Sequence, residues 1–122
     1  MTKKILIVDD ERDLLRVMTM RLTKAGYEIM TATDGREALV LIEEAMPDLV
    51  LLDLRLPVMS GQDVCKKMKS DPKFKNIPII LFTASAGGDI PERARALGAD
   101  DYIIKPFEAE DLLKKIARLI QR

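Results

Sequence analysis

Carboxylates follow directly after two of the apolar runs in this chain. Asp9 and Asp10 come after the run at residues 5–8, and Asp53 comes after the run at residues 49–52. Carboxylates held close together repel one another, so they are either solvated at a loop or gathered around positive charge. Mg²⁺ binds to a few carboxylates together with water and phosphate oxygens. The acidic residues therefore indicate a site for a hard divalent cation, if the fold brings them together.

Two other polar residues stand near the ends of apolar runs further along the chain. Thr83 closes the run "PIILFT", and Lys105 lies in the run "DYIIKPF". A carboxylate such as Asp53 can attack phosphorus, and a cation and a lysine can neutralise the charge that spreads over the transferring oxygens. Any one of these residues could instead be structural: Asp9 could cap a helix, and Thr83 could bond to nearby backbone. Together they indicate a site for a phosphoryl group.

Hydrophobic periodicity supplies the elements that would position these residues. Short apolar runs, typical of strands buried on both faces, alternate with stretches whose apolar residues recur every three or four positions, typical of amphipathic helices. The expected strands are at residues 5–8, 27–32, 48–54, 78–83 and 101–107, and the expected helices are at residues 11–25, 34–46, 61–70, 89–97 and 108–121. The second strand alternates more than the others and suits a sheet edge. Asp34 with Glu37, and Ser60 with Asp63, are typical of helix N-terminal caps.

Strands that alternate with helices predict an α/β fold. Right-handed crossovers give a five-stranded parallel sheet flanked by five helices, and five strands favour the flavodoxin-like order 2-1-3-4-5. Ligands of such sheets bind beyond the carboxyl ends of the strands, here between the first and third strands. The residues expected at that edge of the sheet are Asp9, Asp10, Asp53, Thr83 and Lys105.

Length and composition limit the functions that are available. The chain has 122 residues, 48% of them hydrophobic, which suits a single domain over residues 1–122. Its 20 basic and 20 acidic residues balance, so we expect no direct binding to nucleic acid or to a membrane. The single cysteine, Cys65, and the absence of histidine exclude an internal disulfide, a cysteine metal cluster and histidine-based catalysis. No apolar run approaches the roughly 20 residues that span a bilayer, so we expect a cytoplasmic protein.

The chain closely resembles the receiver domain of the response regulators of bacterial two-component signalling. The resemblance covers essentially the whole chain and rests on "ILIVDDE", "PDLVLLDLRLPVMSG", "IILFTA" and "GADDYIIKPF", in that order. It implies that Asp53 accepts a phosphoryl group from the phosphohistidine of a sensor histidine kinase or a histidine phosphotransfer protein. It also implies a signalling switch rather than an enzyme, one that catalyses only its own phosphorylation and dephosphorylation.

The resemblance also implies roles for the other residues at this edge. Thr83 and Lys105 would bind the phosphoryl oxygens, and the peptide bond between Lys105 and Pro106 would be cis. Mg²⁺, or Mn²⁺ in its place, would be held by Asp9, Asp10, Asp53 and the backbone carbonyl of Arg55. By the same resemblance, Arg55 and Ser85 would border the path of the water that hydrolyses the aspartyl phosphate.

A switch of this kind needs a surface that changes. The resemblance makes Tyr102 the switch aromatic, which turns inward as Thr83 moves toward the phosphoryl group. The changed surface would be formed by the fourth helix, fifth strand and fifth helix, roughly residues 88–121. It would control a downstream output protein or domain, and it could also support a dimer.

Two other classes of protein share parts of this pattern. A phosphatase of the haloacid dehalogenase type also uses an aspartyl nucleophile with Mg²⁺, and it is the main alternative. It needs an acid two residues after the nucleophile, where this chain has Arg55, which cannot give up a proton at neutral pH. A flavodoxin-like cofactor binder would need a phosphate loop rich in Ser, Thr and Gly after the first strand, where this chain has the acidic "DDER".

Overall fold

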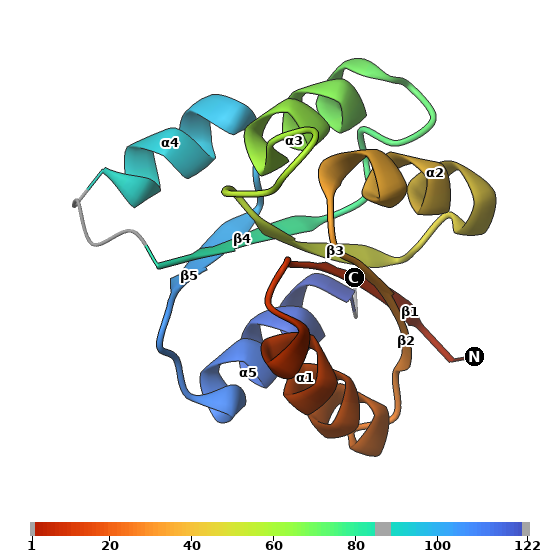
Figure 1. The fold of residues 1–122 in the computed structure, drawn as a ribbon, viewed down its shortest axis with the longest axis vertical. Coiled ribbons are helices and arrows are strands. Elements are labelled where there is room, and N and C mark those ends of the chain that lie inside the picture. The colour runs from red at the N-terminus through yellow and green to blue at the C-terminus, as the bar shows by residue number, and fades with distance from the viewer. Residues whose placement is uncertain (1, 85–88, 121–122) are drawn as a thin grey trace.

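Strands and helices alternate along the whole chain in the computed structural model, which describes residues 2–84 and 89–120. In chain order the elements are β1 (Lys4–Val8), α1 (Arg12–Lys24), β2 (Glu28–Ala32), α2 (Gly35–Ala45), β3 (Leu49–Asp53), α3 (Gly61–Ser70), β4 (Ile79–Thr83), α4 (Ile90–Leu97), β5 (Asp101–Ile104) and α5 (Ala109–Ile120). The strands form one parallel sheet in the order β2-β1-β3-β4-β5 (Figure 1), which confirms the predicted fold.

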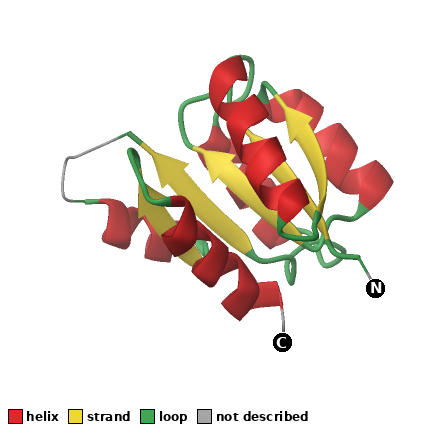
Figure 2. Cartoon of the chain, turned by 90° about the horizontal axis from the view of Figure 1, so that it is seen from below, coloured by secondary structure: helices red, strands yellow, loops and turns green. Residues whose placement is uncertain are grey.

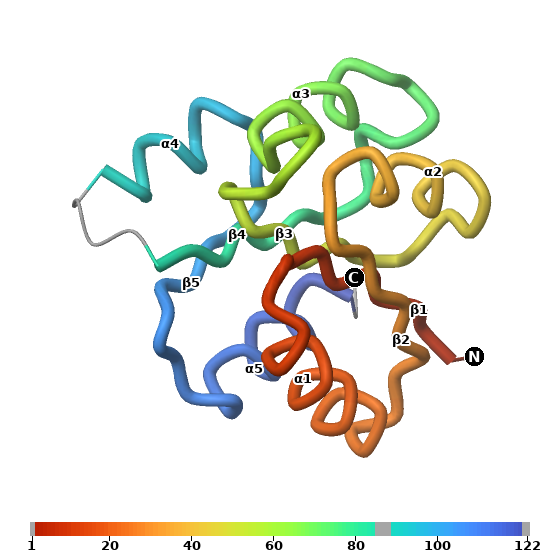
Figure 3. Tube along the Cα trace, viewed as in Figure 1, coloured from red at the N-terminus to blue at the C-terminus, as the bar shows by residue number. Residues whose placement is uncertain are grey.

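Helices cover both faces of this sheet. Figure 1 shows α2, α3 and α4 on one face and α1 and α5 on the other, and Figure 2 shows the sheet between the two helical layers. From α1 on one face, the chain crosses to the face of α2, α3 and α4 after β2 and returns to the face of α1 after β5, a path that can be followed in Figure 3. No helix in the described part of the chain is long and apolar enough to cross a membrane.

The sheet divides the hydrophobic core into two halves, because successive strand residues point to opposite faces. The α2–α4 half-core contains the strand residues Leu6, Val8, Val50, Leu52, Ile79 and Leu81, packed with Ile42, Met68 and Leu97 among others. The α1–α5 half-core contains Ile5, Ile7, Leu49, Leu51, Ile80 and Phe82, packed with Met18, Leu22 and Ile116 among others. Burial on both faces explains why β1, β3 and β4 are continuous apolar runs, whereas β2 is partly exposed at the sheet edge, as predicted.

Local hydrogen bonds fix where two helices begin. The side chain of Asp34 accepts a hydrogen bond from the N–H of Glu37, and that of Ser60 accepts one from the N–H of Asp63. Each bond satisfies a backbone donor in the first turn that has no partner within the helix. Both predicted caps are therefore confirmed.

The fifth strand is shorter than the sequence predicts. The run at residues 101–107 suggested a strand over its whole length, but β5 ends at Ile104. The N–H of Lys105 still donates to the carbonyl of Thr83 at 2.8 Å. Pro106 has no N–H to donate, so the pairing with β4 cannot continue beyond this point.

Cys65 is a core residue of α3. Its side chain is fully buried in the α2–α4 half-core, and its thiol donates a hydrogen bond to the carbonyl of Leu97 at 3.4 Å. Burial raises the pKa of the Cys65 thiol to about 11. The thiolate is the reactive form of cysteine, so this residue joins α3 to α4 rather than serving as a nucleophile.

We predict that native Cys65 resists alkylation. At pH 8, a thiol with a pKa of about 11 is ionised in roughly one molecule in a thousand, and the surrounding side chains also block the reagent. Iodoacetamide should therefore label the native protein far more slowly than the protein unfolded in urea, as followed by mass spectrometry. Cys65→Ala serves as the unlabelled control. Equal labelling rates for native and unfolded protein would contradict this packing.

Candidate functional site

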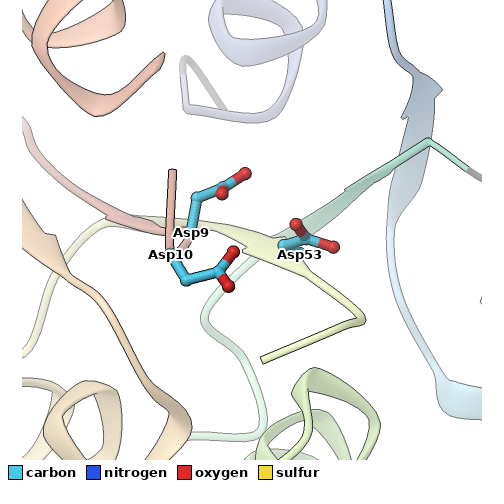
Figure 4. A group of neighbouring side chains, drawn as sticks. All are labelled: Asp9, Asp10 and Asp53. Carbon is cyan, nitrogen blue, oxygen red and sulfur yellow. The ribbon is translucent and has the colours of Figure 1, made fainter. Parts of the chain in front are cut away.

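Three carboxylates meet at the carboxyl edge of the sheet. Val8 of β1 pairs with Leu52 of β3, so Asp9 and Asp53, which follow them, lie side by side. Asp9, Asp10 and Asp53 each offer an oxygen, and these oxygens all lie within 4.8 Å of one another. Figure 4 shows the three side chains around a common space. We call this set the acidic cluster.

A lysine from the other end of the chain neutralises part of this cluster. Asp9 is fully buried and Asp53 is 6% exposed, whereas Asp10 is exposed. Buried carboxylates are stable only when they are paired or hydrogen-bonded. Lys105 Nζ lies 2.6 Å from Asp9 Oδ2 and 3.1 Å from Asp53 Oδ2. The structure therefore brings Lys105 and Asp53 together at this edge of the sheet, where the sequence predicted both.

Burial and charge act in opposite directions on the groups of this site. Burial raises the pKa of the Asp53 carboxyl, and the Arg55 N–H and the Lys105 ammonium offset this only in part. For Lys105, burial acts to lower the pKa, but the hydrogen bonds and negative charges of Asp9 and Asp53 outweigh it, so the pKa is raised. Lys105 is therefore a cation at neutral pH. Further positive charge near Asp53 would favour its ionised form.

The second oxygen of each buried carboxylate is held by the backbone of the turn that follows it. Asp9 Oδ1 accepts a hydrogen bond from the N–H of Glu11 at 2.8 Å, and Asp53 Oδ1 accepts one from the N–H of Arg55 at 3.0 Å. Glu11, not Asp9, is the N-cap residue of α1. Asp9 therefore stabilises the turn before α1, and its other oxygen remains directed to Lys105.

Two glycines fix the loop that follows Asp53. A Cβ atom on Gly61 would lie 1.9 Å from the carbonyl oxygen of Asp53, and one on Gly35 would lie 2.1 Å from that of Met59. Within this loop, Val58 has a φ of 68°, which is rare for a β-branched residue. The N–H of Met59, the next residue, donates to the carbonyl of Pro57 at 2.7 Å. Close packing at both glycines holds the loop in this strained form.

The carboxyl ends of β4 and β5 bring the remaining predicted residues to the same edge. Thr83 is 2% exposed, and it pairs with Ile104, the residue before Lys105. The ammonium of Lys105 lies 4.9 Å from the centre of the Phe82 ring, next to Thr83. The peptide bond between Lys105 and Pro106 is cis.

Tyr102 lies further down β5. It pairs with Leu81, two residues before Thr83, so Tyr102 and Thr83 are on the same face of the sheet. The half-buried ring packs against the α2–α4 half-core, and Lys115 Nζ lies 5.8 Å from its centre. The ring therefore packs in the same half-core as the buried residues of α4.

Glu11 is a residue of this site to which the sequence pattern gave no role. Its Oε1 atom lies 3.6 Å from Lys105 Nζ, so the lysine faces three carboxylates. A glutamate directly after two aspartates was the available signal, but the contact depends on where α1 begins. The side chain of Arg55 is exposed, and Ser85, the other residue expected along the water path, lies outside the described residues.

Comparisons with known proteins agree on one family. Residues 5–117 match the response regulator receiver domain. The chain is 43% identical over 98% of its length to ycf27 of Cyanophora paradoxa, named a probable transcriptional regulator, and it spans about half of that relative (49%). It is similar to the chemotaxis response regulator CheY4 of Vibrio cholerae, with a TM-score of 0.90, 34% identity and coverage of 98% and 99%. It is also similar to the phosphorylated cyanobacterial phytochrome response regulator RcpA, with a TM-score of 0.86, 29% identity and coverage of 99% and 95%.

We predict that Gly61→Ala strongly destabilises the protein. The new methyl group would collide with the backbone of Asp53, which cannot move without disturbing β3. We expect a loss of at least about 2 kcal/mol in the free energy of unfolding, measured by urea denaturation.

The matched control is Gln62→Ala, the next residue of α3, which is half-buried. It should change the free energy of unfolding by about 0.5 kcal/mol or less. Equal stability of the two variants would show that the loop can move away from Gly61.

Proposed function

Because this chain belongs to the response regulator receiver domain family of two-component signalling, we propose that it is a phosphoryl-accepting switch whose acceptor is Asp53. The phosphoryl group would come from the phosphohistidine of a sensor histidine kinase or a histidine phosphotransfer protein. The chain would catalyse only the gain and loss of its own phosphoryl group, without a separate substrate to convert. We take residues 1–122 as one receiver domain.

One observation carries this proposal: a carboxylate at the end of the central strand lies between a lysine ammonium and two further carboxylates. A nucleophile for phosphorus needs positive charge around the oxygens that it attacks. Lys105 supplies one such charge. The acidic cluster supplies the means to recruit a second one.

The donor set of the acidic cluster fits a hard divalent cation. All its donors are carboxylate oxygens, and one carboxylate, Asp10, is exposed to incoming ions. We propose that Mg²⁺, or Mn²⁺ in its place, is held by Asp9, Asp10, Asp53 and the backbone carbonyl of Arg55. A bound cation would supply charge neutralisation for the phosphoryl oxygens.

Phosphoryl transfer then uses groups that the chain itself provides. A carboxylate oxygen of Asp53 forms the new bond to phosphorus as the phosphorus–nitrogen bond to the donor imidazole breaks, and the released imidazole takes up a proton from solvent. The Lys105 ammonium holds the phosphoryl oxygens by charge, and the Thr83 hydroxyl donates a hydrogen bond to them. The backbone N–H of Arg55, already bonded to Asp53, keeps the carboxylate oriented.

Signal output would follow from a shift in conformational population. A phosphoryl group that draws in Thr83 favours the conformer in which the Tyr102 ring fills the vacated space, and this changes the surface of α4, β5 and α5. We propose that an output protein or domain, or a second copy of the chain, binds to that surface. Two relatives support the proposal, one named for its phosphorylated form and one named a probable transcriptional regulator.

We predict that Asp53 is the only acceptor. With Mg²⁺ and phosphoramidate, the wild-type protein should gain one phosphoryl group, measured by intact-mass spectrometry, and Asp53→Asn should gain none. Asp13→Asn, which removes a carboxylate that is 97% exposed on α1, is the control and should be phosphorylated like the wild type. Equal uptake by Asp53→Asn would refute the assignment.

We predict that Mg²⁺ stabilises the fold before any phosphorylation. A ligand that binds only the native state adds about 1.4 kcal/mol at ten times its Kd, so the melting temperature should rise with Mg²⁺ at constant ionic strength. Asp10→Asn should shrink this rise, because it removes one ligand. It should also stabilise the protein without Mg²⁺, because it removes one repelling charge. Identical Mg²⁺ responses of the two proteins would exclude Asp10 as a ligand.

A further inference from the structure

Glu11 contacts the site in two ways. Its backbone N–H donates to Asp9 Oδ1 at 2.8 Å, and its side-chain Oε1 lies 3.6 Å from Lys105 Nζ. The side chain is 67% exposed and stands at the N-cap of α1, where the helix dipole favours negative charge. One residue therefore touches both a buried carboxylate of the acidic cluster and the lysine that neutralises it.

Lys105 pairs with two carboxylates that a divalent cation would also bind, and Glu11 offers it a further partner. The two closest partners of Lys105 are Asp9 and Asp53, at 2.6 and 3.1 Å, and both belong to the acidic cluster. A divalent cation bound to the cluster would share the charge of the same carboxylates and weaken their attraction for the ammonium. Among the described residues, Glu11 is the ion-pair partner of Lys105 that lies outside the cluster.

We propose that Glu11 is a positioning residue that keeps the Lys105 ammonium beside Asp53 when a divalent cation takes over Asp9 and Asp53. The inference rests on the proposed function. Glu11 touches neither Asp53 nor the phosphoryl group; it acts through Lys105. The Glu11–Lys105 ion pair replaces part of the attraction to Asp9 and Asp53 that Lys105 would lose to a cation. The cation therefore binds more easily, and the ammonium stays in place to bind the phosphoryl oxygens.

Loss of the Glu11 charge should weaken Mg²⁺ binding and slow phosphorylation. Without the Glu11 charge, the ion pairs that Lys105 keeps among the described residues are those with Asp9 and Asp53. A cation must then weaken both of them without compensation, so Mg²⁺ binds more weakly. Once Mg²⁺ is saturating, the released ammonium is less well ordered, so phosphorylation is slower. Both effects should be modest, about two- to fivefold, and should shrink at high salt, because the Glu11 side chain is largely exposed.

The test compares Glu11→Gln with the wild type and with Asp13→Asn, which removes an exposed charge from the same helix without touching Lys105. Isothermal titration gives the Kd for Mg²⁺, and phosphoramidate at saturating Mg²⁺ gives the phosphorylation rate. We expect Glu11→Gln to raise the Kd and lower the rate, each about two- to fivefold, with Asp13→Asn like the wild type. Glu11→Asp, which keeps the charge, should recover part of both effects.

A second background separates positioning from a direct charge effect on the cation. Lys105→Met replaces the lysine with an uncharged, unbranched side chain. In this background, Glu11→Gln should change the Kd for Mg²⁺ and the phosphorylation rate less than it does in the wild type. An equal effect in both backgrounds would overturn the positioning role. Wild-type values for Glu11→Gln would overturn it as well. A wild-type protein that binds no Mg²⁺ and accepts no phosphoryl group would instead overturn the proposed function, and this inference with it.

Discussion

The ion pair of Lys105 with Asp9 and Asp53 is the interaction on which the rest of the site depends. Its partners are 96 and 52 residues away along the chain, so only the parallel sheet brings them together. Two buried carboxylates would be unstable without it, and a lysine whose side chain is only 14% exposed would be less stable without them. The order of the strands matters for the same reason. β1 and β3 must be neighbours to place the acids, and β5 must end level with β4 for the lysine to reach across.

The remaining features of the site limit the freedom of these three side chains. Each buried carboxylate has one oxygen on its own turn and the other on the lysine, so neither can rotate without breaking a hydrogen bond. Gly61 brings the start of α3 against the strand that carries Asp53. The site is therefore organised before any cation or phosphoryl group arrives, and less conformational entropy is lost when one binds.

The sequence predicted the parts of this arrangement that depend on local pattern. Buried runs and amphipathic stretches defined the sheet and its order, and the ends of those runs placed Asp9, Asp53 and Lys105 at one edge. What it could not predict depends on distances between elements. The contact of Glu11 with Lys105 requires the position of α1 relative to β5, and the close approach of Gly61 requires the path of a loop. The early end of β5 was predictable in principle, because Pro106 cannot donate to a neighbouring strand.

The division of the core by the sheet has a consequence for how this protein tolerates change. Met18 packs in the α1–α5 half-core and Met68 in the α2–α4 half-core, with the backbone of the sheet between them. Substitutions at such a pair share no side-chain neighbours within these clusters, so their free energies should add, whereas those within one half-core should couple. Each half can therefore accumulate substitutions in evolution without regard to the other. At the carboxyl edge, by contrast, Asp9, Asp53 and Lys105 pair with one another and must change in concert.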